Sequence, residues 1–297
     1  MNAAAELARP HLRQHEPMAR HTSWRVGGPA DVYFEPNDLP ELQAFLAGLP
    51  AGTPLLWVGL GSNLLVRDGG FRGAVVCLGK GFAGIAALDE RTLTAGAAVP
   101  CAKLAQQLGR AGLAGGEFLA GIPGTVGGAL AMNAGAHGGE TWQRVRAVQT
   151  IDRAGNVHRR TPADYRIAYR SVAGPPDEWF IGAEFAFEPA DAESVQAAIH
   201  ALLRRRAATQ PLRQANAGSV FRNPPGDHAA RLIEAAGLKG LTVGKAQVST
   251  VHANFIVNLG GARAADIETL IDTLQQRVEA AFGVRLEPEV RRVGEPG

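Results

Sequence analysis

The chain has 297 residues, of which 46% are hydrophobic and 20% charged, with 30 basic side chains against 28 acidic ones. Its formal net charge of +2 is too small to indicate a nucleic-acid partner. The length predicts about two domains, each large enough to bury its own core. The 37 glycines and 18 prolines stay below the share typical of disordered chains, so their excess must lie in ordered loops.

The cysteine usage and the apolar stretches bear on the compartment. Cys77 and Cys101 form neither a C-x-x-C motif nor a disulfide framework, which is typical of reduced thiols in a cytoplasmic protein. Residues 1–20 lack the apolar core of a signal peptide and are expected to form a tail. Two long uncharged stretches, 42–66 and 118–139, contain prolines and, in the second, many glycines that disfavour a membrane span. We expect a soluble, cytoplasmic protein with no membrane partner.

The first two thirds of the chain alternates short apolar runs with turns, which predicts strands joined by tight loops. Pro100 and Gly112 mark the ends of a helix that carries Leu104 and Leu108 on one face. The strands expected here lie at 55–58, 74–78, 145–152, 156–160 and 179–187, with a hairpin turn at 153–155.

A stronger helix is predicted from Asp191, its N-cap, with Val195 and Ile199 on its apolar face. Arginines 204–206 fall in its last turn, where positive charge complements the helix dipole, so they indicate a solvated helix end. Pro211 breaks the pattern, and the main domain boundary is expected there. Beyond it we expect helices at 227–236 and 265–282 and strands at 255–259 and 284–293, so both parts mix helices and strands.

Two glycine-rich segments indicate a bound phosphate group. The longer runs from Gly121 to Gly139 without a lysine or arginine, so its donors to an anion would be main-chain amides. The shorter, 59–65, follows a predicted strand but lacks the last glycine of a dinucleotide fingerprint, and the chain has no Walker motif. We interpret the two segments as loops that bind one dinucleotide in another type of fold. Tight turns without a ligand are the alternative.

Two candidate catalytic residues lie in the last third of the chain. Ser219, in the segment 216–224, lacks the G-x-S-x-G surroundings of a nucleophile and has no nearby histidine. It is therefore a turn residue or a proton donor. Glu289 lies on a predicted strand, where an exposed carboxylate neutralised by a neighbouring arginine is the slightly favoured interpretation.

Further polar residues give weaker signals. His252, Asn254 and Asn258 are expected on one strand face, where they line a pocket or face water. The pair 169–170, Tyr-Arg, carries little information by itself. The histidines of the N-terminal tail have no carboxylate partner, so no metal site is expected.

Taken together, eight segments resemble the UDP-N-acetylenolpyruvoylglucosamine reductase family in residue type and in order. They extend from about residue 20 to residue 293, nearly the whole chain, and their combination is far more specific than any one of them. The segments are 25–31, 59–65, 121–129, 132–136, 169–170, 216–224, 252–258 and 288–291.

The resemblance implies an α+β fold. It consists of an FAD-binding fold of the vanillyl-alcohol oxidase (PCMH) type in two subdomains, followed by a C-terminal α+β substrate-binding domain. The expected division is an N-terminal tail at 1–20, FAD-binding subdomains at 21–79 and 80–209, and the substrate-binding domain at 210–297.

The resemblance also implies a reaction and its cofactors, FAD and NADPH. NADPH reduces the flavin, and the flavin N5 delivers hydride to UDP-N-acetylglucosamine enolpyruvate, giving UDP-N-acetylmuramate for peptidoglycan precursor synthesis. In this family the glycine loops bind FAD. The implied cofactor-binding residues are Gly59, Gly61, Ser62, Asn63, Leu64, Gly121, Pro123, Gly124, Gly127, Gly128, Asn133 and Gly135.

Three residues would carry the chemistry in such an enzyme. Ser219 would protonate the substrate carbon next to the one that accepts hydride. Arg170 and Glu289 would polarise the substrate carboxylate and stabilise the enol, for which Glu289 needs a raised pKa. The implied substrate contacts are Arg222, Asn223 and Asn254. The expected partners are the small-molecule substrate and NADPH.

The chain departs from the family pattern in three ways. Ser171 follows Arg170 directly, whereas the family has a residue between them, so the pair 165–166 competes with the pair 169–170 for the catalytic role. His137 stands where an aromatic residue is common. An extended substrate-domain loop with an extra tyrosine is missing, which indicates the shorter subtype.

Two other functions are compatible with the same glycine loops. A flavin oxidase of this fold would pass electrons to oxygen and would not need Ser219. A nucleotide-binding regulatory module would bind its ligand without turnover, and Ser219→Ala would change nothing in it. The reductase is the favoured interpretation because Ser219, Arg170 and Glu289 each fall inside a matching segment.

Overall fold

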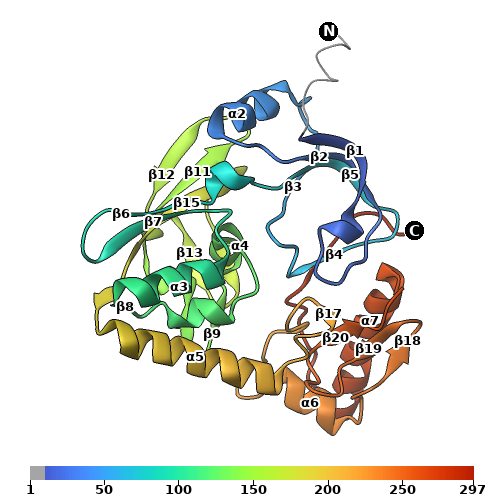
Figure 1. The fold of residues 1–297 in the computed structure, drawn as a ribbon. Coiled ribbons are helices and arrows are strands. Elements are labelled where there is room, and N and C mark those ends of the chain that lie inside the picture. The colour runs from blue at the N-terminus through green and yellow to red at the C-terminus, as the bar shows by residue number, and fades with distance from the viewer. Residues whose placement is uncertain (1–10) are drawn as a thin grey trace. The chain divides into compact units, whose positions relative to one another are not determined.

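The computed structural model describes residues 11–297, which form two compact units (Figure 1). Of the described residues, the first unit contains 11–13, Val32–Gly59 and Ala74–Arg205. The second unit contains Gln14–Asp31, Leu60–Gly73 and Arg206–Gly297. The last division falls close to the boundary expected at 209–210, whereas the segments at 14–31 and 60–73 group with the C-terminal part, which the sequence did not indicate.

The centre of the first unit is an antiparallel five-stranded sheet in the order β12-β11-β15-β7-β6. Its strands are β6 (Ile85–Ala87), β7 (Thr92–Gly96), β11 (Val145–Asp152), β12 (Val157–Arg160) and β15 (Glu178–Ala186). The hairpin and the long strand predicted from the sequence are confirmed by β11, β12 and β15. Their valine, isoleucine, threonine and aromatic residues favour a pleated, half-buried surface.

Helices cover this sheet on two sides. α3 (Cys101–Ala111), α4 (Val126–Met132) and α5 (Ala192–Thr209) contribute to one buried cluster, which contains Leu104, Leu130 and Ile199. α2 (Leu39–Gly48) packs into a second cluster together with Ile151 and Ile181 of the sheet. The predicted ends of α3 are confirmed, because Gly112 closes the helix in the left-handed region with φ 63°.

A further sheet has the order β1-β2-β5-β3, with strands β1 (Leu12–Pro17), β2 (Pro29–Phe34), β5 (Phe71–Val76) and β3 (Leu55–Trp57). The division between the units falls within three of these strands. The prediction of a tail at 1–20 is therefore wrong for 12–17, while 1–10 lie outside the described residues. β1 is an edge strand of mostly polar residues, so its hydrogen-bonding partner, and not an apolar pattern, determines its conformation.

Short elements complete the first unit. They are η2 (Lys80–Phe82), β8 (Leu113–Ala114), η3 (Glu117–Gly121), β9 (Gly135–Ala136), β10 (Gly139–Glu140), η4 (Thr141–Gln143), η5 (Pro162–Asp164), β13 (Arg166–Ala168), β14 (Ser171–Ala173) and β16 (Glu188–Pro189). Two of the resulting hairpins, β9–β10 and β13–β14, carry candidate site residues.

In the second unit, α7 (Ala264–Phe282) packs on an antiparallel sheet in the order β17-β20-β19-β18 (Figure 1). The remaining elements are η1 (Met18–Arg20), β4 (Leu64–Val66), β17 (Ala215–Asn216), α6 (Ala229–Ala235), β18 (Thr242–Val243), β19 (Ala246–Val248), β20 (Ile256–Asn258) and β21 (Arg291–Val293). The predicted apolar face of α7 is confirmed, with Ile267, Leu270 and Leu274 buried in the core of this unit. Gly283 ends the helix with φ 68°, as expected.

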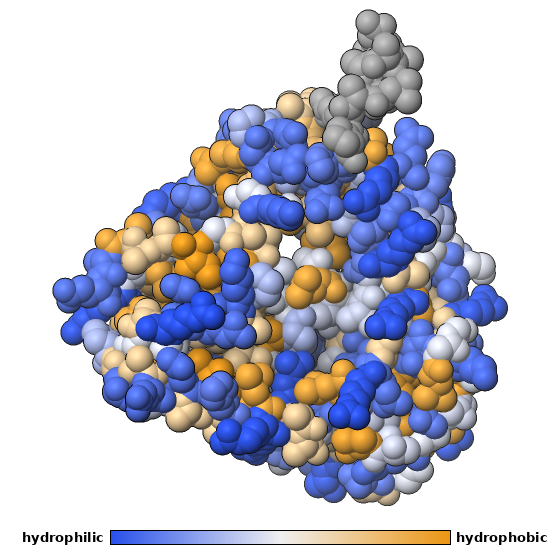
Figure 2. Space-filling view, in the orientation of Figure 1, coloured by the Kyte–Doolittle hydropathy of each residue, from blue (hydrophilic) through white to orange (hydrophobic). Residues whose placement is uncertain are grey.

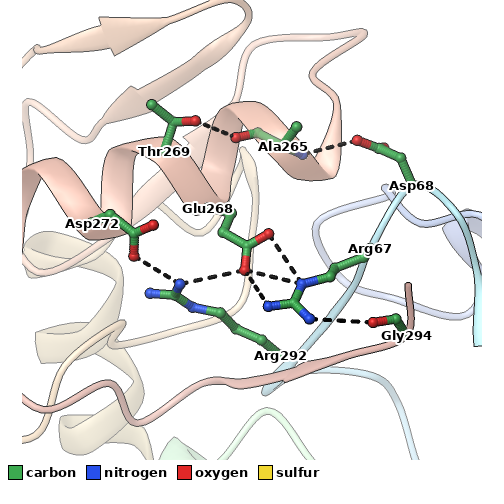
Figure 3. Close-up of polar contacts among 8 residues, drawn as sticks. All are labelled: Arg67, Asp68, Ala265, Glu268, Thr269, Asp272, Arg292 and Gly294. Carbon is green, nitrogen blue, oxygen red and sulfur yellow. Dashed lines mark hydrogen bonds and ion pairs between the residues drawn. The ribbon is translucent and has the colours of Figure 1, made fainter. Parts of the chain in front are cut away.

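Charged side chains connect α7 to β21 and to the residues directly after β4, the strand that pairs in parallel with β21 (Figure 3). Arg67 Nη2 donates to Glu268 Oε1 at 2.8 Å, and Arg292 Nη1 donates to Asp272 Oδ1 at 2.8 Å. The hydrogen bond from Arg67 holds the pKa of Glu268 below its usual range. Asp68 accepts from the first two N–H groups of α7, at 2.9 and 3.0 Å, and thus satisfies donors at the helix start.

The C-terminal segment differs from the strand predicted at 284–293, because only Arg291–Val293 form one. Pro288 forms an isolated antiparallel bridge with Phe221, at a position where its missing N–H is not needed. Single backbone contacts replace the ladder. Glu289 N donates to Val220 O at 2.7 Å, and Arg222 N donates to Glu287 O at 2.9 Å.

Hydrophilic residues cover most of the face seen in Figure 2, and hydrophobic residues lie scattered among them. This distribution agrees with a chain that is 46% hydrophobic and 20% charged. Among residues 11–297, no helix is long and apolar enough to cross a membrane.

Candidate active site

Two glycine-rich loops lie against each other in the first unit. A Cβ atom on Gly59 would lie 2.5 Å from Thr125 Oγ1 and 3.2 Å from its methyl carbon, closer than real Cβ contacts. Thr125 is buried and stands at the N-cap of α4, directly after Gly124. The structure thus brings together parts of the two segments that were expected to bind one ligand, and any side chain at position 59 would force Thr125 to shift.

The rest of the longer loop is fastened to the segment before α3. Val126 N donates to Val99 O at 2.8 Å, Gly127 N donates to Ala97 O at 2.9 Å, and Cys101 N donates to Gly124 O at 2.9 Å. Gly128 N donates to Thr125 Oγ1 at 3.4 Å. The amides at 126–128 therefore serve the fold, and the stretch Gly121, Pro123 and Gly124 is the part of the loop left to approach a ligand.

The residues after Gly59 belong to the second unit. Gly61 has φ 61°, and a Cβ there would overlap the backbone of His21. Ser62 is half-buried, and Leu64 is the buried first residue of β4. Asn63 Nδ2 donates to Glu289 O at 3.1 Å, and Arg291 N donates to Asn63 O at 3.0 Å. This stretch therefore fixes the backbone that carries Glu289.

In the same unit, backbone hydrogen bonds link the segments that carry Ser219 and Glu289. Both residues are half-buried. Val220, next to Ser219, accepts from Glu289 N at 2.7 Å and donates to Asn254 O at 2.9 Å. Asn254 is buried, and its side chain makes both bonds to the backbone of Phe221, accepting at 3.0 Å and donating at 2.8 Å. Asn254, expected as a substrate contact, thus fixes the segment beside Ser219.

The other two expected substrate contacts also have partners within the protein. Asn223 Oδ1 accepts from Ala229 N at 3.1 Å, at the first residue of α6. Arg222 Nη1 lies 3.7 Å from Glu287 Oε2, and its side chain is 35% exposed. The expectation that His252 and Asn254 share a strand face with Asn258 is wrong, because 252 and 254 lie in the turn before β20. Burial lowers the pKa of His252.

Arg170 stands at the tip of the β13–β14 hairpin in the first unit. The strands pair Ala168 with Ser171, so Tyr169 and Arg170 form a two-residue turn. Arg170 Nη2 donates to Gly135 O at 2.7 Å and Nη1 donates to Asn133 O at 3.3 Å, and its side chain is only 14% exposed. Arg170, which was expected to be catalytic, is therefore a neighbour of Asn133 and Gly135, which were expected to bind FAD.

The two competing Tyr-Arg pairs have different environments. Tyr165 packs against Trp142, with ring centroids 4.8 Å apart, and against Phe180 at 5.7 Å. Burial raises its pKa to about 12, so its hydroxyl stays protonated. Arg166 is exposed. Arg170, by contrast, is largely buried against the loop that contains Asn133 and Gly135, and this favours the pair 169–170 for the catalytic role.

Glu140, in the β9–β10 hairpin, was not indicated by the sequence. Glu140 accepts from Asn133 Nδ2 at 2.9 Å, and its other oxygen lies 4.0 Å from Arg170 Nη1. His137 and Gly138 form the turn, with φ 52° and 89°, and a Cβ on Gly121 would lie 3.2 Å from the His137 ring. A positive φ was foreseeable at Gly138, but nothing in the spacing of Glu140 predicted its contact with Asn133.

The fold and the paired glycine loops define a flavin-binding protein, and comparison with known proteins agrees. A family model described as FAD binding domain matches residues 30–161. These residues contain Gly59, the loop from Gly121 and the Asn133–Glu140 region. A second model, described as UDP-N-acetylenolpyruvoylglucosamine reductase, C-terminal domain, matches residues 210–293, which contain Ser219 and Glu289.

Individual relatives match nearly the whole chain. The UDP-N-acetylenolpyruvoylglucosamine reductase of Alkalilimnicola ehrlichii is 57% identical over 296 residues, covering 99% of both chains. That of Methylococcus capsulatus is 57% identical over 282 residues, covering 95% of this chain and 93% of its own. The solved structure of the reductase from Thermus caldophilus has a TM-score of 0.82 and 35% identity, covering 94% of this chain and 97% of that one.

The chain therefore belongs to the UDP-N-acetylenolpyruvoylglucosamine reductase family and is an FAD-containing oxidoreductase. The predicted α+β class, an FAD-binding fold followed by a separate C-terminal domain, is confirmed. The residues of the first unit fit a flavin nucleotide. Gly59 lies against Thr125, where a larger side chain would collide. The two loops therefore meet at glycine backbone that no side chain covers, and such backbone can approach a pyrophosphate closely.

Proposed function

We propose that this protein reduces UDP-N-acetylglucosamine enolpyruvate to UDP-N-acetylmuramate with NADPH, in peptidoglycan precursor synthesis. FAD, when bound, supplies the hydride that adds to the methylene carbon of the enolpyruvyl group. The double bond is thereby consumed, and the neighbouring carbon of the resulting enol must accept a proton. We place the reaction in the cytoplasm, where UDP-sugars and NADPH are available.

Ser219 is the proposed proton donor to that carbon. A hydroxyl is a weak acid, but the enol carbon is strongly basic, so transfer from a well-placed serine is feasible, and solvent then returns the proton. Ser219 is half-buried, while backbone bonds on its C-terminal side fix Val220 to Asn254 and Glu289. The hydroxyl is therefore presented by a rigid backbone whose geometry does not depend on the serine side chain.

Arg170 and Glu289 are the proposed stabilisers of the substrate carboxylate. An arginine that is 14% exposed and oriented by two backbone carbonyls suits a carboxylate, because its donors are already in place when negative charge develops. Glu289 helps in this role when it carries a proton and donates it in a hydrogen bond. For Arg222 and Asn223 we propose substrate contact, and for Asn254 support of the segment that carries Ser219.

The observation that carries this proposal is the bond from Glu289 N to Val220 O at 2.7 Å, which joins the Ser219 and Glu289 segments within a matched reductase domain. The test is the substrate-dependent oxidation of NADPH by the FAD-loaded protein, with the product identified by mass spectrometry. We expect one NADPH consumed per product, and a product heavier by two hydrogen atoms. Oxidation of NADPH that needs oxygen and not the enolpyruvyl nucleotide would indicate an oxidase instead.

A further inference from the structure

Arg170 has an unusual backbone for its residue type. At the second position of the two-residue turn its φ is 53°, in the left-handed region, where glycine or asparagine is usual. A residue with a long side chain keeps such a backbone conformation when the surrounding contacts determine it, and residues of this kind are frequent at functional sites. The contacts that orient this side chain come from the segment 133–140.

Asn133 connects the Arg170 hairpin to the end of α4. Its side chain accepts from Trp142 N at 3.1 Å and donates to Ala168 O at 3.2 Å and to Glu140 Oε2 at 2.9 Å. Ala168 is the last residue of β13, immediately before the turn. Asn133 is itself left-handed, with φ 48°, and buried. The side-chain amide of Asn133 is thus fully hydrogen-bonded within the protein, which gives this residue a role apart from contact with the cofactor.

Glu140 completes the arrangement. One carboxylate oxygen accepts from Asn133, and the other lies 4.0 Å from Arg170 Nη1. Gly135 leaves room for the guanidinium, since a Cβ there would lie 3.2 Å from Arg170 Nη1 and 3.1 Å from Glu140 Cγ. The guanidinium of Arg170 therefore faces two backbone carbonyls and one carboxylate, all from the segment 133–140.

We propose that Asn133 and Glu140 are positioning residues for Arg170 in the reduction, an inference that rests on the proposed role of Arg170. The carboxylate of Glu140 acts on Arg170 in two opposite ways. It restricts the orientation of the guanidinium, which favours the transition state. Its negative charge also weakens the attraction of Arg170 for the carboxylate of a bound ligand.

These opposite effects give a signature that a structural role lacks. In Glu140→Gln we expect kcat to fall about tenfold, because a misplacement of about 1 Å can cost up to 10²-fold and the carbonyl contacts persist. The dissociation constant of UDP-N-acetylmuramate, which carries the carboxylate, should fall about two- to fivefold, because a negative charge 4.0 Å from Arg170 is removed. A loss of local structure would instead weaken binding and lower kcat together.

The experiment uses the FAD-loaded enzyme and five variants: Glu140→Gln, Asn133→Gly, Arg170→Lys, the double variant of Glu140→Gln with Arg170→Lys, and Glu184→Gln. Glu184 on β15 forms an ion pair with Arg159 on β12, at 2.8 Å, and Glu184→Gln serves as the control whose rate and product affinity should not change. Flavin is reduced photochemically without NADPH, its reoxidation by the enolpyruvyl nucleotide is timed, and product binding to the oxidised enzyme is titrated. Asn133→Gly, which keeps the left-handed backbone accessible, should slow reoxidation in the same way.

The double variant decides whether Glu140 acts through Arg170. We expect Glu140→Gln to add nothing to the effect of Arg170→Lys on the rate of reoxidation, because the geometry that Glu140 supports is already lost. Additive effects on the rate, an unchanged rate in Glu140→Gln, or weaker product binding in that variant would each overturn the inference. If the unmodified enzyme does not reoxidise with the nucleotide, the proposed function fails, and the binding titrations alone then decide whether Glu140 modulates Arg170.

Discussion

The two units present their candidate residues by different means. In the first, the side chain of Arg170 is oriented by the carbonyls of Asn133 and Gly135 and by the nearby carboxylate of Glu140, all from the segment 133–140. In the second, Ser219 lies beside Val220, whose backbone is bonded to Asn254 and Glu289, so the main chain determines its place. Substitutions near Arg170 should therefore change geometry, while removal of the Ser219 hydroxyl should change chemistry alone.

The largest expected effect is that of Ser219→Ala. We expect kcat to fall about 10²–10⁴-fold, the range for removal of a positioned acid, because the enol would lose its proton donor. The thermal unfolding midpoint should not change, since the bonds of this segment come from the backbone of Val220. Steady-state kinetics and a thermal melt measure both quantities.

Ser194→Ala is the control for that substitution. Ser194 is an exposed serine of α5, and its hydroxyl donates to Asp191 O at 2.7 Å. Its removal should leave kcat unaltered. An active Ser219→Ala enzyme would contradict the proposed proton donor.

Asn254→Ala should destabilise the main-chain segment that carries Ser219. The substitution leaves the buried N–H and C=O of Phe221 without their side-chain partners, so we expect a loss of about 2–3 kcal/mol in the free energy of unfolding. Urea unfolding followed by circular dichroism measures this change. Asn156→Ala, at an exposed hairpin position, should cost far less. Equal stability of the two variants would show that Asn254 does not fix the Ser219 segment.

Gly59→Ala tests the contact between the glycine loops of the first unit. The new Cβ would lie 2.5 Å from Thr125 Oγ1, so one of the loops must shift, and we expect the affinity for FAD to fall about tenfold. Titration of the apoprotein with FAD gives the dissociation constant. Addition of Thr125→Ala to the Gly59→Ala variant should restore part of the affinity for FAD. Gly48→Ala, with no atom within 4 Å of its added Cβ, is the control that should bind FAD normally.

The smallest effect is expected in the ion network of α7. Glu268→Gln should lower the stability by about 1 kcal/mol at neutral pH, because the carboxylate is only partly buried between Arg67 and Arg292. The pKa of Glu268 is lowered in the folded state, so its contribution is complete above the ordinary value of 4.5 and disappears as the pH falls through the folded pKa. Denaturant titrations should therefore show the difference between variant and parent vanishing in acid.

Local sequence signals predicted the elements that are locally encoded. The α3 helix between Pro100 and Gly112, the β11–β12 hairpin and the apolar face of α7 all follow from caps, turns and periodicity. The strand β1 was not predictable in this way, because its residues are polar and its partner strand supplies the hydrogen bonds. The expected C-terminal strand is shorter than predicted, because before Arg291 it makes an isolated bridge at Pro288 in place of a continuous ladder.

In the candidate site, too, local features were predictable from the sequence and tertiary contacts were not. Glycine spacing indicated which loops bind a nucleotide, and the resemblance assigned roles to Ser219, Glu289 and Arg170. The contact of Gly59 with Thr125 and the bonds of Asn133 with Glu140 depend on tertiary packing, which single-residue patterns do not encode. Asn254 was expected at the substrate for its polarity, whereas burial directs both ends of its amide to Phe221.

The most direct test of the central claim is an anaerobic flavin experiment. The FAD-loaded protein is reduced with NADPH, the enolpyruvyl nucleotide is added without oxygen, and the flavin absorbance is followed. The account predicts that the absorbance of oxidised flavin returns at once on this addition, and that it returns slowly in Ser219→Ala. A flavin that stays reduced until air is admitted would contradict the proposed reduction of the enolpyruvyl nucleotide.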